Sequence, residues 1–113
     1  MAERRAEARV RAQLRVEVSG SDAHCNRFHE TVLASSLSQS GALLTNVQAE
    51  LRCGHLLAVE YGGQHAFYRI VWVLGGAEGE GTEVAIQRLA GQICPWESVL
   101  PPELAPAHDL EGS

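Results

Sequence analysis

The clearest indication of the fold is the stretch His55-Leu-Leu-Ala-Val-Glu-Tyr-Gly-Gly-Gln-His-Ala-Phe-Tyr-Arg-Ile-Val-Trp-Val-Leu74. Gly62-Gly63 separates two apolar segments, residues 55–61 and 64–74, and a two-residue glycine connection is typical of a tight hairpin turn. The second segment is β-branched and aromatic, as strands prefer. The sequence therefore predicts an antiparallel hairpin here, with Trp72 in the protein core.

Strand character continues on both sides of this hairpin. Residues 13–19 alternate between apolar and polar side chains, which predicts a half-buried strand. Further strands are predicted at residues 28–35, 41–45 and 82–89, with a turn from Ser36 to Gly41. We therefore expect an all-β fold, a small six-stranded antiparallel barrel with room for a short terminal helix, since closing the sheet removes its exposed edges.

The 113 residues predict a single domain in three parts. Residues 1–12 are expected to be an arginine-rich arm, helical or mobile, residues 13–101 the barrel, and residues 102–113 a flexible tail. Trp96, which follows Pro95, is predicted to cover the end of the barrel.

The expected compartment is the cytoplasm. No apolar run approaches the ~18 residues of a membrane span, and the charged N-terminal segment lacks the apolar region of a signal peptide. The cysteines, an odd number widely spaced, fit free thiols in a reducing compartment. They are Cys25, Cys53 and Cys94. No pairing typical of a metal site and no catalytic arrangement occurs, so we expect neither a metal, a cofactor nor enzymatic activity.

Charge is divided unevenly along the chain. Residues 1–18 carry five Arg and three Glu, a net of +2, whereas residues 19–113 carry four Arg and eleven acids, a net of −7. An acidic body argues against DNA or RNA as partners, which need a broad basic face. The chain has no lysine, so any anion must be bound by guanidinium or backbone N–H groups.

Two short motifs suggest which anion. Arg5-Ala-Glu-Ala-Arg9 has the form RxxxR, and Ser36-Leu-Ser-Gln-Ser-Gly41 has the form SxSxxG. Their order and separation resemble the two signature motifs of the bacterial PilZ domain. The likeness covers roughly residues 4–100, and that family also folds as a six-stranded barrel. One position departs from the family pattern, which has Asp or Asn where this chain has Ser36.

The resemblance implies a receptor for the second messenger cyclic di-GMP. It places ligand contacts at Arg5 and Arg9, with Arg4 as a third arginine contact, and at the three second-motif positions Ser36, Ser38 and Gly41. Guanidinium groups bind phosphates in fork geometry and pair with the O6 and N7 atoms of guanine. A glycine at 41 would permit positive φ and a close approach of ligand to backbone.

The expected function is that of a signalling receptor, which passes the level of the second messenger to an unidentified effector protein without inserting into a membrane. The alternative is a degenerate PilZ-fold adaptor that binds only protein, which Ser36 favours. Read alone, the RxxxR segment also suits a solvated helix, since Glu7 and Arg11 form an i,i+4 pair.

Overall fold

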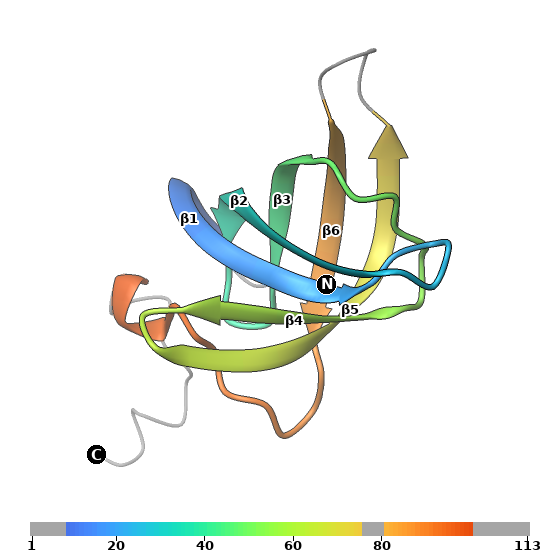
Figure 1. Ribbon diagram of the computed structural model, residues 1–113. Helices are drawn as coiled ribbons and strands as arrows, with labels where there is room; N and C mark the ends of the chain where they lie inside the picture. Colours follow the sequence, from blue (N-terminus) through green and yellow to red (C-terminus); the bar gives the residue numbers. More distant parts are fainter. Residues whose placement is uncertain (1–8, 76–80, 101–113) are drawn as a thin grey trace, which may run out of the picture.

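Six antiparallel strands close into a barrel in this computed structural model, which describes residues 9–75 and 81–100 (Figure 1). The expected all-β barrel is confirmed. Around the barrel the order is β1-β2-β3-β6-β5-β4. The strands are β1 (Val10–Ser21), β2 (Arg27–Leu37), β3 (Gly41–Val47), β4 (Leu56–Tyr61), β5 (Gln64–Gly75) and β6 (Thr82–Arg88), followed by a short 3₁₀ helix, η2 (Glu97–Val99).

The barrel interior is filled by the apolar side chains that alternate inward along each strand. Val16 and Val18 of β1 are buried, as are Leu57 and Val59 of β4. β4 and β5 pair from Leu56 opposite Arg69 to Tyr61 opposite Gln64. This register leaves the glycine pair as the two-residue turn of the hairpin, as predicted. Both Gly62 and Gly63 have positive φ, of 63° and 83°, a conformation that only glycine adopts without strain. Alternation and turn chemistry together thus account for this hairpin.

Strands β1 and β2 extend beyond their predicted residues toward the two motifs. β1 begins at Val10, so residues 10–12 belong to the barrel rather than to the arm. β2 continues through Leu37, so Ser36 lies in a strand and not in the turn. The extension follows from pairing, because Val10 and Arg11 lie opposite Leu37 and Ser36. The predicted tail, residues 102–113, and most of the predicted arm lie outside the described residues.

The prediction that Trp72 belongs to the core is wrong. Its side chain is 42% exposed, because the pairing of β5 with β6 shifts register between Ile70 and Trp72. This β-bulge places Val71 and Trp72 both on the outside and returns the alternation inward only at Val73. Ala66, Tyr68 and Ile70, before the bulge, are buried.

The chain after β6 packs back onto the barrel through Trp96. This side chain is fully buried, its ring centroid lies 5.5 Å from that of Tyr68, and Leu100 is buried as well. Burial raises the pKa of the Tyr68 hydroxyl. The C-terminal segment is therefore part of the core as far as Leu100.

The barrel closes where β1 meets β4. Here only three residue pairs are in register: Glu17 with Glu60, Val18 with Val59, and Ser19 with Ala58. The valines point inward and are buried. In the described ranges, 9–75 and 81–100, no helix is long and apolar enough to cross a bilayer.

Candidate functional site

Arg9 and Ser36 meet on the outside of the barrel. The Nε group of Arg9 donates a hydrogen bond to the Ser36 hydroxyl oxygen at 2.9 Å. The pairing of Val10 with Leu37 positions them, because it sets the beginning of β1 beside the end of β2. One residue from each predicted motif is thus brought to the same place.

Two hollows open on either side of the Arg9 side chain. One, of about 370 Å³, runs over the ends of β1 and β2 and is lined by Arg9, Val10, Arg11, Ser35, Ser36 and Leu43. The other, of about 270 Å³, runs over β3, β6 and β5 and is lined by Arg9, Ser40, Gly41, Ala42, Val71, Ala85, Ile86 and Gln87. We refer to these two hollows together as the Arg9 groove.

The charge of the Arg9 groove is locally positive. Among the described residues that line it, the charged side chains are Arg9 and Arg11, and none is a carboxylate. This contrasts with a net charge of −5 for the whole chain. Paired guanidinium groups without a competing carboxylate suit a phosphate or phosphodiester ligand.

Ser38 does not face the Arg9 groove. It is 1% exposed, and its hydroxyl oxygen accepts a hydrogen bond from the Gly41 N–H at 3.1 Å. The Ser38 N–H in turn donates to the Gly41 carbonyl oxygen at 3.0 Å. The hydroxyl therefore closes the turn between β2 and β3.

Hydrogen-bond donors from the end of β6 and from the segment after it also bind this turn. The indole Nε1 of Trp96 donates to the Ser38 carbonyl oxygen at 3.0 Å. The Nε of Arg88 donates to the Gln39 carbonyl oxygen at 2.9 Å, and the Arg88 N–H donates to the Ser40 carbonyl oxygen at 2.6 Å. These bonds satisfy backbone acceptors that the turn would otherwise leave without partners.

Gly41 lines the groove, but a glycine is required at this position because a neighbouring strand leaves no room for a side chain. A Cβ atom at this position would lie 2.5 Å from the carbonyl oxygen of Ile86 in β6. Gly41 is absent from the described glycines with positive φ, so the expected left-handed turn is not found. The close approach that requires a glycine here comes from the chain's own backbone.

The remaining predicted contacts, Arg4 and Arg5, lie outside the described residues. Two groove residues, Arg11 and Val71, were missed by the sequence interpretation. Arg9 and Arg11 are two positions apart, so an extended segment predicted from Arg9 onward would have placed both on one face. Val71 faces outward in β5 and lines the groove from there, and no sequence signal indicated that β5 lies beside Arg9.

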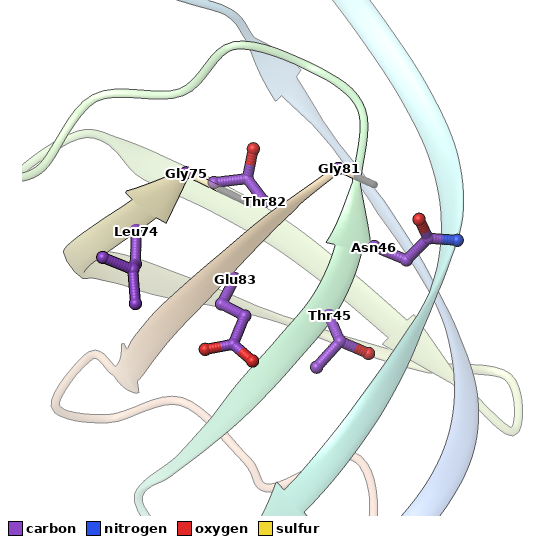
Figure 2. Close-up of a pocket in the computed structure, with 7 residues that line it drawn as sticks. All are labelled: Thr45, Asn46, Leu74, Gly75, Gly81, Thr82 and Glu83. Atoms are coloured by element: carbon purple, nitrogen blue, oxygen red, sulfur yellow. The ribbon is translucent and has the colours of Figure 1, made fainter. Parts of the chain in front are cut away.

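A larger hollow, of about 600 Å³, lies between the ends of β3, β5 and β6 (Figure 2). Thr45 and Asn46 line it from β3, and Leu74 and Glu83 line it from β5 and β6. The charged residue among its described lining is Glu83, an acid, which opposes an anionic ligand. Size alone therefore does not make it the better site for a phosphodiester.

A fourth hollow, of about 180 Å³, contains Glu17, His29, Glu60 and His65. The His29 Nε2 lies 2.7 Å from a Glu17 carboxylate oxygen. In the part of the chain that the structure describes, no three His, Cys, Asp or Glu side chains are arranged to hold a metal ion.

Comparisons of the chain with protein families, with curated proteins and with solved structures found no match. The site is therefore interpreted from its own geometry.

Proposed function

We propose that this protein is a PilZ-type receptor that binds cyclic di-GMP in the Arg9 groove and passes the signal to a partner protein. The hydrogen bond between Arg9 and Ser36 carries the proposal. It joins the two motifs that resemble the PilZ signature, which lie far apart in the sequence, at one hollow whose charged residues in the described lining are arginines.

The groove supplies groups suited to both parts of such a ligand. A phosphodiester would bind the two Nη groups of Arg9, because Nε is bonded to Ser36. Arg11, in the same hollow, offers a second guanidinium for a phosphate or a guanine edge.

A protein-only adaptor is the second candidate, and the second motif favours it. The Ser38 hydroxyl is already hydrogen-bonded within its turn, and the contact with β6 requires a glycine at position 41. Both residues would therefore be needed for folding even in a chain that binds no nucleotide. Ser36 supports the adaptor too, because a hydroxyl cannot supply the charge-assisted bonds that a carboxylate makes to guanine N–H groups.

Isothermal titration with cyclic di-GMP distinguishes the two functions. We expect wild type to bind, and Arg9→Ala to bind about 10- to 100-fold more weakly, since a charge-assisted contact contributes about 1.5–3 kcal/mol. Arg27→Ala is the matched control, because Arg27 begins β2 at the end opposite Ser36. It should bind as wild type does.

The outcome is decisive in either direction. A wild type that does not bind cyclic di-GMP excludes the receptor and leaves the adaptor. Binding that Arg9→Ala leaves unchanged places the ligand elsewhere on the protein. Cyclic di-AMP, titrated in parallel, should bind more weakly, because adenine lacks the paired N–H donors and O6 acceptor of guanine.

A further inference from the structure

We propose that the outer face of β5, which adjoins the Arg9 groove at Val71, is a homodimer interface. The β5 face consists of Phe67, Arg69, Val71, Trp72 and Leu74. Its three largest apolar side chains, Phe67, Trp72 and Leu74, are 45%, 42% and 57% exposed. Contiguous apolar surface of this kind on a folded domain is characteristic of an interaction site.

The β-bulge creates this face. Without it, strict alternation after Ile70 would direct Trp72 and Leu74 inward. Val71 faces outward in either case, and the register shift between Ile70 and Trp72 moves Trp72 and Leu74 to the same outer side. The exposed row is therefore built into the pairing of β5 with β6.

The neighbouring strands leave the β5 face open. Ala58 of β4 lies opposite Phe67, and Ala85 of β6 lies opposite Trp72. Methyl groups beside the two aromatic rings leave their surfaces uncovered. Leu56, which is 50% exposed and lies opposite Arg69, extends the apolar area onto β4.

The charges beside this apolar row identify a second copy of the chain as the occupant. Arg69 lies on one side of Val71 and Trp72, and Glu83 of β6, opposite Leu74, lies on the other side. Neither side chain makes a hydrogen bond or ion pair that the structure records among its described residues. The face thus carries one unpaired charge of each sign, arranged about an apolar centre.

A two-fold rotation makes this arrangement complementary to itself. If the axis passes beside Val71 and Trp72, in the plane of the interface and across the strands, the second copy's β5 runs antiparallel over the first. Arg69 of each copy then faces Glu83 of the other, and the Trp72 side chains meet at the centre. This is an isologous interface, in which one patch serves both subunits, and aromatic residues and arginine are the side chains enriched in such contacts.

Charge reversal tests the pairing by analytical ultracentrifugation of the full chain across micromolar concentrations. We expect wild type to dimerise, and Arg69→Glu and Glu83→Arg each to dimerise at least ~10-fold more weakly, since like charges would face each other twice. An equimolar mixture of these two variants should form a heterodimer, because every facing pair is again opposite in sign. The double variant R69E/E83R should recover the homodimer.

Two further variants separate the interface from general effects. Arg27→Glu makes the same charge change away from the β5 face and should leave dimerisation unchanged. Trp72→Ser should weaken it, with the far-ultraviolet circular dichroism of a barrel retained. A wild type that stays monomeric assigns the face to a different protein and overturns the proposal. Single reversals that dimerise normally, or a mixture that does not associate, also overturn it.

Discussion

Residues of the connection between β2 and β3 take part in the fold as well as in the candidate site. Gly41 lines the Arg9 groove, and at the same time its missing side chain admits the Ile86 carbonyl of β6. Ser38 closes the turn with its hydroxyl. A loss of ligand binding on mutating either residue would therefore not by itself identify a ligand contact.

Gly41→Ala is expected to destabilise the protein by about 1–3 kcal/mol, the usual cost of forcing an extra methyl group into a packed site. The new Cβ would lie 2.5 Å from the Ile86 carbonyl oxygen, so β3 and β6 must separate. Urea unfolding measures the effect. Gly75→Ala is the matched control, because a Cβ there meets no atom within 4 Å.

The control should change the free energy of unfolding by less than ~0.5 kcal/mol in the destabilising direction. Equal destabilisation by both variants would show that strand flexibility, and not the contact with Ile86, sets the requirement at position 41.

Single residues show how far the sequence could predict the site. The resemblance predicted Arg9 and Ser36 as contacts to one ligand, and in the structure the two side chains are hydrogen-bonded to each other. The partners of Ser38 could not be predicted. Its carbonyl bonds with Trp96, far along the chain, and no local pattern encodes such a pairing.

Among the elements, the strands were predictable and their irregularities were not. Alternation and the glycine pair located the hairpin of β4 and β5 to within about a residue. The bulges, between Ile70 and Trp72 in β5 and between Ala34 and Ser36 in β2, are fixed by the facing strand. The β5 bulge places Trp72 outside, a change of face that a period-two pattern cannot anticipate.

Mutating each of the two tryptophans tests whether the segment after β6 is part of the core. Trp96→Phe removes the donor to the buried Ser38 carbonyl and opens a cavity beside Tyr68. We expect it to lower the free energy of unfolding by at least about 2 kcal/mol. Trp72→Phe, on the exposed face of β5, should lower it by less than ~0.5 kcal/mol.

Denaturant unfolding at a concentration where the chain is monomeric measures both variants. The contrast would be contradicted by Trp72→Phe being the more destabilising change. Such a result would place Trp72, and not Trp96, in the core, as alternation alone predicts.

At the scale of the whole molecule, the closure of the barrel brings two acids together. Glu17 and Glu60 lie opposite each other where β1 meets β4, and both line the same hollow. Like charges directly across two strands are destabilising. This junction, with three pairs in register, is therefore a weak place in the closed sheet.

Glu60→Lys should raise the free energy of unfolding by about 0.2–1 kcal/mol, since it converts a repelling pair into an attracting one. Glu97→Lys, in η2, makes the same change in net charge away from this junction and serves as the control. Thermal unfolding at low salt compares them. An equal rise in the free energy of unfolding for both variants would mean that net charge alone causes the effect.

The same junction has a consequence for the order of folding. β1 pairs with β2, β2 with β3, β4 with β5 and β5 with β6, all neighbours along the chain. The two other junctions, β3 with β6 and β1 with β4, form only after a long loop is closed, and β1 with β4 has the fewer pairs in register. Loop closure of this kind opposes early pairing. We therefore expect β1 and β4 to join after the transition state. In stopped-flow experiments, Glu60→Lys should slow unfolding and leave the folding rate almost unchanged. A faster folding rate for Glu60→Lys would instead mean that β1 and β4 are already paired in the transition state, so that the barrel closes before its hairpins are complete.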